Sequence, residues 1–183
     1  MLSDNAVEAC NIRPGCSAEA SLLTDLAIRS KGYWGYDSIF LRDCRDELTI
    51  TPEFIESNVV LVMERDGVVM GFYSLERRTD IEVELVHLFI EPDSIGHGFG
   101  RQLFKHAAEW ARHAGFKDLV IKSDPFAEPF YKAIGAKLIG LESSTIRPGR
   151  TLPLLRFDLC AFNSQAFTDI GKGAKVEVKT DIA

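Results

Sequence analysis

One stretch of the chain, residues 82–107, constrains the fold more than any other. It opens with an apolar, β-branched run that predicts a strand over residues 81–90, and Pro92 and Asp93 end that run. Glycine then stands at every second position from 96 to 100, and apolar residues follow at helical spacing to about residue 114. We therefore expect a strand that leads through a glycine-rich loop into a helix.

This order of elements suits the binding of a phosphate or pyrophosphate. The first N–H groups of a helix have no acceptor within the helix, and that end of the helix carries partial positive charge. Alternating glycines lack the Cβ atoms that would keep a ligand away from these N–H groups. Arg101, at the start of the helix, would add a charge-assisted hydrogen bond. The alternative is a tight turn that binds nothing.

Two known phosphate loops are excluded by their spacing. The dinucleotide pattern G-x-G-x-x-G fails because Arg101 stands where the third glycine belongs, and no second mononucleotide-binding half follows. The pattern G-x-x-x-x-G-K-[ST] is absent from the sequence. A nucleotide-binding βα protein is therefore disfavoured.

The loop resembles the acyl-CoA pyrophosphate loop of the GNAT superfamily of N-acyltransferases. In that superfamily a strand, often with proline soon after it, leads into Arg/Gln-x-x-Gly-x-Gly/Ala at the start of a helix. Ile90, Pro92, Gly98 and Gly100 fall in register with this pattern, whereas Ile95 replaces the usual Arg or Gln. Backbone N–H groups do most of the phosphate binding in that family, so the replacement weakens the resemblance without breaking it.

A second run, residues 124–135, resembles the GNAT pattern Asn-x-x-Ala-x-x-Phe-Tyr-x-x-x-Gly. Ala127, Phe130, Tyr131 and Gly135 match this pattern. Asp124 replaces the usual Asn, which puts in doubt any contact that needs an amide donor. The two motifs follow one another in the order that the family shows.

The resemblance implies an N-acetyltransferase that moves the acetyl group of acetyl-CoA to a primary amine by direct attack in a ternary complex. Such a reaction needs a base for the amine and a proton donor for the departing CoA thiolate. By resemblance, Tyr131 is the proton donor. For the base we favour Glu84, which shares a strand face with Glu82 beside apolar residues, so that partial burial would raise its pKa. Glu82, His87 or a water molecule are the alternatives.

The resemblance also assigns the residues that would bind acetyl-CoA. They come from the strand, the glycine-rich loop and the second motif: Leu88, Phe89, Ile90, Gly96, His97, Gly98, Phe99, Gly100, Arg101, Asp124, Ala127 and Phe130.

An acceptor pocket is expected on the opposite side. Tyr33, Trp34 and Tyr36 gather between two predicted helices, and rings with polar tips suit the wall of a pocket, although they would also serve to plug the edge of the domain. In the late loop, Arg147 and Arg150 are either ligands for a carboxylate or phosphate on the acceptor or ordinary surface charges. We expect a small-molecule or peptide amine as the acceptor, and the sequence does not narrow this class.

The order of predicted elements is β-α-α-β-β-β-α-β-α-β-β. It indicates an α/β (mixed α+β) fold, with a central mixed, mostly antiparallel sheet flanked by helices, as in the GNAT fold. One domain is expected over residues 10–160, with a loose N-terminus over residues 1–9 and a polar tail over residues 161–183. Asp66 and Gly67 predict a hairpin turn, and Pro153 predicts that the last strand lies at an edge or carries a bulge.

Composition excludes several classes of protein. A net charge of −6 and a pI near 5.3 argue against nucleic acid or an anionic membrane as partner. The four cysteines form no C-x-x-C pair, and there is no signal peptide or long apolar run, so we expect reduced cysteines and a cytoplasmic location. The four histidines lack metal-ligand spacing, so no metal is expected. GNAT proteins often dimerise, which makes a homodimer a further expectation. A module that binds acyl-CoA without catalysis is the alternative to an enzyme.

Overall fold

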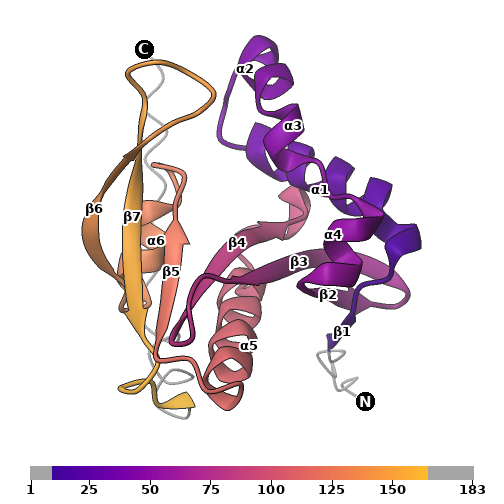
Figure 1. Ribbon diagram of the computed structural model, residues 1–183. Coiled ribbons are helices and arrows are strands. Elements are labelled where there is room, and N and C mark those ends of the chain that lie inside the picture. The colour runs from indigo at the N-terminus through magenta and orange to yellow at the C-terminus, as the bar shows by residue number, and fades with distance from the viewer. Residues whose placement is uncertain (1–9, 165–183) are drawn as a thin grey trace, which may run out of the picture.

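The computed structural model describes residues 10–164; residues 1–9 of the predicted N-terminus and residues 165–183 of the predicted tail lie outside the described residues. Within that part, seven strands form one sheet in the order β1-β2-β3-β4-β5-β7-β6 (Figure 1). The expected mixed, mostly antiparallel sheet flanked by helices is confirmed. The strands are β1 (Asn11–Pro14), β2 (Val59–Arg65), β3 (Val68–Arg77), β4 (Glu82–Ile90), β5 (Asp118–Lys122), β6 (Lys137–Ser143) and β7 (Thr151–Asp158).

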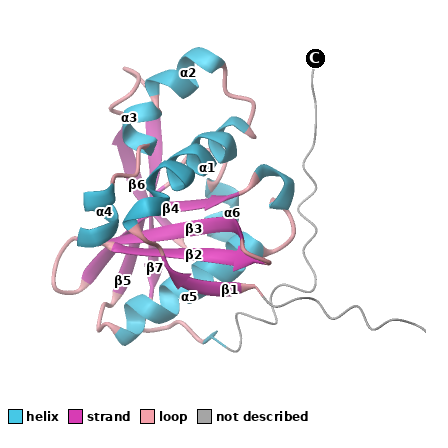
Figure 2. Ribbon diagram, turned by 90° about the vertical axis from the view of Figure 1, so that its right-hand side faces the viewer, coloured by secondary structure: helices cyan, strands magenta, loops and turns pink. Residues whose placement is uncertain are grey.

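Helices cover both faces of the sheet. Helices α1 to α4 lie over one face, and α5 and α6 lie over the other (Figure 2). Under α5, the small buried residues Ala107, Ala108 and Ala111 let the helix approach β3 and β4 closely. The helices are α1 (Ala20–Gly32), α2 (Ser38–Asp43), α3 (Arg45–Leu48), α4 (Pro52–Ser57), α5 (Phe99–His113) and α6 (Glu128–Ala133), with 3-10 turns η1 (Ser17–Glu19) and η2 (Pro92–Ser94).

Strands β2, β3 and β4 form the predicted antiparallel meander. The turn between β2 and β3 is at Asp66 and Gly67, both of which have the positive φ that a tight hairpin turn requires. Strands β4 and β5 are parallel, as expected for strands joined by a crossover helix, here α5.

Two short helices, α2 and α3, follow α1 and meet at Cys44. Asp37 caps α2, because its carboxylate accepts a hydrogen bond of 2.7 Å from a backbone N–H in the first turn. Thr51 caps α4, and Pro52 stands at the first position of that helix.

The edge position predicted for the last strand is wrong. Strand β7 lies between β5 and β6 and is antiparallel to both. The Pro153 carbonyl accepts a hydrogen bond of 2.8 Å from Ser123 N, which lies just beyond the end of β5. In an antiparallel pair the N–H and the C=O of one residue face the same neighbouring strand, so the missing N–H of Pro153 also faces the end of β5. The proline is therefore tolerated at this position. The edge strand is β6, and it carries a register shift between Leu138 and Gly140.

A bulge in β4 redirects the side chains of that strand. Ser74 of β3 pairs with His87, but Leu75 pairs with Leu85, so Val86 is the extra residue. As a result, Leu85 and His87 point to opposite faces although they are two positions apart. Leu85 packs in the core beneath α5, and His87 packs among rings on the α1 side.

The first residues of the predicted polar tail pack on the domain. Phe162 is buried, and its ring centroid lies 5.5 Å from that of Phe157 in β7. Among residues 10–164, no helix is long and apolar enough to span a membrane.

Gly71 provides a test of the close packing between β3, β4 and α5. A Cβ at this position would lie 2.6 Å from the Phe89 carbonyl oxygen and 2.7 Å from Cδ1 of Ile90. We expect Gly71→Ala to lower the free energy of unfolding by about 1–3 kcal/mol, measured by urea denaturation. Gly140→Ala in β6 is the matched control, because a Cβ there meets nothing within 4 Å. Equal losses in the two variants would contradict this packing.

Candidate functional site

The divergence of β4 and β5 creates the candidate site. Their parallel register runs from the Glu82–Asp118 pair to the Leu85–Ile121 pair and stops, although β4 continues over residues 86–90. Figure 1 shows the two strands side by side at their lower ends and apart at the top. In the described chain, residues 86–90 pair with no strand on the side that faces β5. A strand with one such edge can accept hydrogen bonds from an extended ligand or donate to it.

The strip of three residues predicted to bind acetyl-CoA, residues 88–90, lies on this part of β4. Leu88 and Phe89 are half-buried, on opposite faces of the sheet. Ile90 is buried, and its N–H donates to Oγ of Ser30 in α1 at 3.4 Å. The end of α1 therefore covers the last residue of the strip.

The predicted glycine-rich loop connects β4 to α5. Gly96 and Gly98 both have a φ of 86°, and Gly98 is the N-cap of α5. These two positions need glycine because other residues rarely adopt this conformation. A Cβ added at either would meet nothing within 4 Å, so there is open space beside both. Gln102 N makes the first internal hydrogen bond of the helix, to Gly98 O at 3.1 Å. The N–H groups of residues 99–101 precede that bond and suit an anion.

Three residues of the predicted cofactor site meet at the start of α5. A Cβ at Gly100 would lie 3.6 Å from the Phe130 ring and 3.9 Å from Ile90, so strand, loop and α6 converge there. Ala127 is the residue before α6 and packs at the edge of the same core. Arg101 is half-buried in the first turn of α5.

Asp124, from the second motif, is the centre of a charged cluster. Its carboxylate accepts hydrogen bonds from Lys31 Nζ at 2.9 Å and from Arg150 Nη2 at 3.1 Å. The Tyr36 hydroxyl donates to the same carboxylate at 2.9 Å, and Phe126 N donates to it at 3.0 Å. We call Lys31, Tyr36, Asp124 and Arg150 the Asp124 cluster.

Charge and burial act on the cluster in opposite directions. Burial alone would raise the pKa of Asp124, but the Lys31 ammonium and the hydrogen bonds from Lys31, Phe126 N and Tyr36 outweigh it and lower that pKa. The pKa of Tyr36 rises to about 12, first because of burial and then because its hydroxyl donates to the Asp124 carboxylate. The carboxylate is therefore charged and the phenol protonated at neutral pH.

The three aromatic residues predicted to line the acceptor pocket lie beside this cluster. The rings of Trp34 and Phe126 stack with 5.9 Å between centroids, and Tyr36 meets Phe126 edge-on at 5.4 Å. Tyr33 packs on Trp34 and is exposed. The loop between α1 and α2 thus contacts the segment between β5 and α6, across the open end between β4 and β5.

The loop between β6 and β7 joins from the other side. Arg147 lies over the Phe40 ring and within 3.9 Å of the Asp37 and Asp43 carboxylates. Thr145 contacts the Glu47 carboxylate in α3. Together with Arg150, these contacts connect the C-terminal part of the sheet to α2 and α3.

Tyr131, the predicted proton donor, is buried in α6 against the rings of Phe104 and Phe130. Burial raises its pKa, and the negative charge of Asp124 raises it further. The Tyr131 phenol is therefore protonated at neutral pH, and it is close enough to Asp124 to sense that charge.

The predicted bases differ in their surroundings. Glu84 is half-buried beside Arg78, with 3.6 Å between charged atoms, and Glu82 pairs with Arg156 at 3.2 Å. His87 is enclosed, with Nδ1 2.7 Å from the Ser74 hydroxyl, and burial lowers its pKa to about 4. His87 is therefore neutral and lies in the core, whereas the two glutamates reach the surface.

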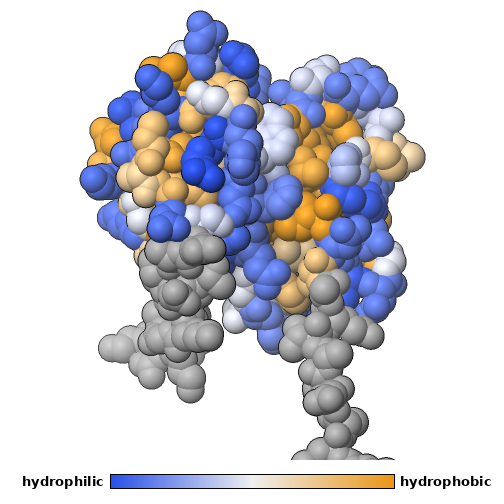
Figure 3. Space-filling view, turned by 90° about the horizontal axis from the view of Figure 1, so that it is seen from below, coloured by the Kyte–Doolittle hydropathy of each residue, from blue (hydrophilic) through white to orange (hydrophobic). Residues whose placement is uncertain are grey.

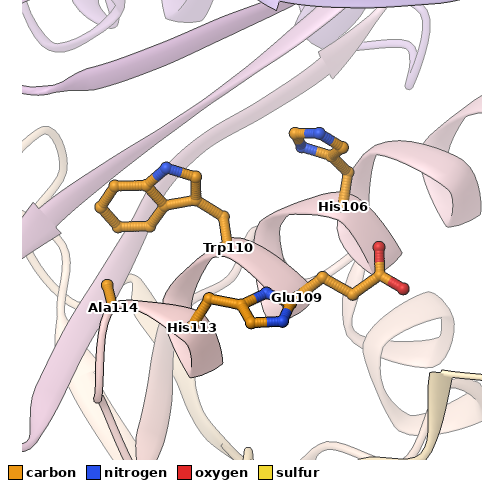
Figure 4. Close-up of a pocket in the computed structure, with 5 residues that line it drawn as sticks. All are labelled: His106, Glu109, Trp110, His113 and Ala114. Atoms are coloured by element: carbon orange, nitrogen blue, oxygen red, sulfur yellow. The ribbon is translucent and has the colours of Figure 1, made fainter.

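Two surface hollows lie elsewhere on the described part of the chain. One, of about 470 Å³, is lined by His106, Glu109, Trp110, His113 and Ala114 on α5 (Figure 4). The other, of about 510 Å³, shares Trp110 and Ala114 with it and extends along β3 and β4. Figure 3, seen from below, shows hydrophobic residues gathered among polar ones on the face where α5 ends. Neither hollow includes the glycine-rich loop or the Asp124 cluster. No group of three or more His, Cys, Asp or Glu residues within the described chain is placed to hold a metal ion.

The sequence predictions missed Lys31 and Phe126 in this region. Lys31 directly precedes the aromatic run, and Phe126 lies inside the second motif, so both stand beside residues that were singled out. The sequence gives no signal that these segments touch, because the contact joins positions about 90 residues apart.

The Acetyltransferase (GNAT) family matches residues 17–136, which is more than half of the chain. The chain belongs to the GNAT family of acetyltransferases. No curated protein matches it significantly. Among solved structures, PaiA N-acetyltransferase from Thermoplasma acidophilum in complex with coenzyme A is 17% identical, with a TM-score of 0.67 over 82% of this chain and 99% of that one. YncA from Salmonella typhimurium with acetyl-CoA is 22% identical, with a TM-score of 0.61 over 82% and 94%. These two similarities support the GNAT fold.

The charge of Asp124 gives a prediction for stability against pH. The pKa of Asp124 in the folded protein lies below that of an unfolded aspartate, about 3.9. The Asp124 carboxylate therefore stabilises the fold above that pH. This stabilisation is lost as the pH falls through the folded-state pKa. We expect Asp124→Asn to lower the free energy of unfolding by about 1–3 kcal/mol near neutral pH. The difference from the unsubstituted protein should shrink below about pH 4 in thermal unfolding.

Asp80→Asn is the matched control, because that side chain is fully exposed in its pair with Arg77. We expect no measurable change in that variant. A loss in Asp124→Asn that stays constant into strong acid would show that the charge is not its cause.

Proposed function

We propose that this protein is an N-acetyltransferase that transfers the acetyl group of acetyl-CoA to a primary amine by direct attack in a ternary complex. The observation that carries the proposal is the convergence of three segments. The unpaired edge of β4, the glycine-rich start of α5, and Phe130 from α6 all meet where β4 and β5 separate. PaiA with coenzyme A and YncA with acetyl-CoA share the fold and support the choice of co-substrate.

The residues around the glycine-rich loop fit a pyrophosphate. There is open space beside Gly96 and Gly98, and the N–H groups of residues 99–101 lie at the positive end of α5. The half-buried residues Leu88 and Phe89 would hold the pantetheine arm along the edge of β4. Bound in this way, the thioester would supply an activated acetyl group and a thiolate leaving group.

Two residues of the chain are proposed to move protons. Tyr131 holds its proton at neutral pH and would give it to the departing sulfur. Glu84 is the proposed base for the amine. It pairs with Val120 in the sheet register, four residues before Asp124, which is roughly 13 Å along a strand. An acceptor held at the Asp124 cluster would extend its amine toward Glu84, which would take the proton directly or through one water molecule.

The acceptor is proposed to bind on the side of the sheet covered by α1 and α2, between Tyr33, Trp34 and Tyr36 and the loop that follows β6. A small-molecule or peptide amine fits this proposal. Homodimer formation and a cytoplasmic location remain predictions from the sequence.

Substitution of two glycines, one at each end of α5, tests the co-substrate site. Gly98 and Gly115 both have positive φ, and a Cβ at either meets nothing within 4 Å. We expect Gly98→Ala and Gly115→Ala to lose similar stability, about 1–2 kcal/mol, because alanine is strained in this conformation. Acetyl-CoA at 100 times its dissociation constant should stabilise the unsubstituted protein and Gly115→Ala by about 2.7 kcal/mol in thermal unfolding.

Gly98→Ala should lose most of that stabilisation, because only its Cβ lies beside the proposed phosphate site. No stabilisation of the unsubstituted protein by acetyl-CoA or CoA would refute the proposed function itself.

The proton-transfer roles are tested by kinetics. We expect Tyr131→Phe and Glu84→Gln each to lower kcat by about 10²- to 10⁴-fold, with little change in the affinity for acetyl-CoA. Tyr73→Phe is the matched control, because the Tyr73 hydroxyl is buried and bonded to Nδ1 of His106 at 2.9 Å, outside the site.

An unchanged kcat in Tyr131→Phe would remove Tyr131 from the mechanism. Binding of acetyl-CoA without transfer to any amine would favour the module that binds acyl-CoA without catalysis.

A further inference from the structure

The Asp124 cluster holds more positive charge than negative charge. Lys31 and Arg150 are both bonded to the single carboxylate of Asp124, and the other member of the cluster, Tyr36, is neutral at physiological pH. Among described residues, no second carboxylate lies within 4 Å of either cation. The cluster therefore carries a net charge of about +1.

This charge is largely removed from water. The side chains of Lys31, Asp124 and Arg150 are only 13%, 16% and 17% exposed. A partly buried charge without a counterion is unfavourable, so a site of this kind favours a ligand of opposite sign.

Both cations also lie against rings that fix their position. The Arg150 guanidinium is 5.0 Å from the centroid of Phe40 and 5.8 Å from that of Tyr36, and Lys31 Nζ lies 5.3 Å from the Tyr36 centroid. The Arg147 guanidinium lies 4.8 Å from the centroid of the same Phe40 ring. The rings lower the freedom of the cations before any ligand arrives.

Donor capacity remains on both cations. Lys31 Nζ can donate three hydrogen bonds and makes one, to Asp124. Arg150 uses Nη2 for both of its side-chain hydrogen bonds, to Tyr36 and Asp124, so Nε and Nη1 make none within the described chain. These groups can bind a carboxylate without breaking the existing bonds.

We propose that Lys31 and Arg150 bind an anionic group of the acceptor, and that the acceptor is a primary amine that also carries a carboxylate, as in an amino acid. This inference rests on the proposed function and names the substrate class of the same site. The anion supplies the missing negative charge, and the aromatic wall of Trp34, Tyr36 and Phe126 packs against the rest of the molecule. The amine end is left free to reach the thioester.

The first experiment compares pairs of acceptors that differ only in this charge. Each acid is assayed against its amide, with acetyl-CoA as co-substrate. The acids are glycine, β-alanine, 4-aminobutyrate and 5-aminovalerate, which vary the distance from amine to carboxylate, together with the standard L-amino acids. We expect at least one acid to exceed its amide by about 10- to 100-fold in kcat/KM, the size of a charge-assisted contact. Acids and amides that react equally well, or a consistent preference for amides, would overturn the proposal.

The second experiment assigns the preference to the two cations. Lys31→Gln and Arg150→Gln should reduce the preference for the acid over the amide by about 10-fold or more, because kcat/KM falls further for the acid than for the amide. Lys137→Gln and Arg112→Gln remove the same charges from exposed positions that form no ion pair within residues 10–164, and they should keep the preference. Arg150→Lys, which retains the positive charge, should retain part of the preference for the acid. An acid preference that survives both Lys31→Gln and Arg150→Gln would overturn the proposal.

A third measurement separates the acceptor from CoA as the source of the anion. Calorimetry compares the binding of CoA and of dephospho-CoA to the Arg150→Gln variant. If only the binding of CoA is weakened, the Asp124 cluster binds the 3′-phosphate of CoA. If the binding of both is weakened equally, the cluster binds the pyrophosphate. Either result overturns the proposal, which expects both affinities to stay unchanged.

If no amine in the panel is acetylated, the same acid–amide pairs are compared for thermal stabilisation of the CoA-bound protein. A larger shift with an acid supports the anion site, and equal shifts overturn it. Failure of CoA itself to stabilise the protein would refute the proposed function. Stabilisation by CoA without discrimination between acid and amide would instead overturn only the anion site.

Discussion

The early end of the pairing between β4 and β5 is the constraint on which the rest of the site depends. The register stops at Leu85 and Ile121, and the bulge at Val86 follows at once. An extra residue increases the local twist of a strand and bends it, so the end of β4 turns away from β5. The bulge also changes which side chains face α5. One local irregularity therefore opens the sheet and selects the residues that line the opening.

Helix α5 keeps the opening in a fixed relation to the glycine-rich loop. Its buried alanines allow the helix axis to lie close beneath β3 and β4, and Gly71 removes the side chain that would collide with Phe89 and Ile90. The N-terminal end of the helix is then held beside the unpaired edge of β4. A backbone site for an anion becomes useful only when its position is fixed in this way, since N–H groups have short reach.

The open end is held by side chains from three distant segments. Lys31 and Tyr36 come from the end of α1 and the loop after it, Asp124 follows β5, and Arg150 precedes β7. Exposed ion pairs contribute little to stability, but removal of one partner from a mostly buried set leaves the others without compensation. The cluster thus holds two loops against each other at the place where the sheet itself provides no bonds.

Sequence reasoning succeeded where the determining forces are local. The glycine-rich loop and the hairpin at Asp66 each follow from the conformational preferences of a few neighbouring residues. Resemblance then supplied the fold, because two motifs in the right order carry information about the whole chain.

What could not be predicted depends on contacts between remote segments. The position of β7 inside the sheet contradicted the local preference of Pro153, since tertiary pairing placed the missing N–H at the end of β5. The partners of Asp124 were invisible because no local pattern links positions 31, 124 and 150. The bulge at Val86 was also missed, and with it the placement of His87 on the sheet face opposite to Leu85.

Asp124 links acceptor binding to proton donation in the proposed reaction. An asparagine there, as in the family pattern, would leave Lys31 and Arg150 without a counterion, whereas the aspartate balances one of them and raises the pKa of Tyr131. An acceptor carboxylate bound to the two cations would bring a second negative charge to the same region and disfavour the Tyr131 phenolate further. A raised pKa keeps the phenol protonated before the reaction, but it also makes the phenol a weaker acid toward the CoA thiolate. In the proposed complex, the charges that select the acceptor also keep the proton donor in its protonated form.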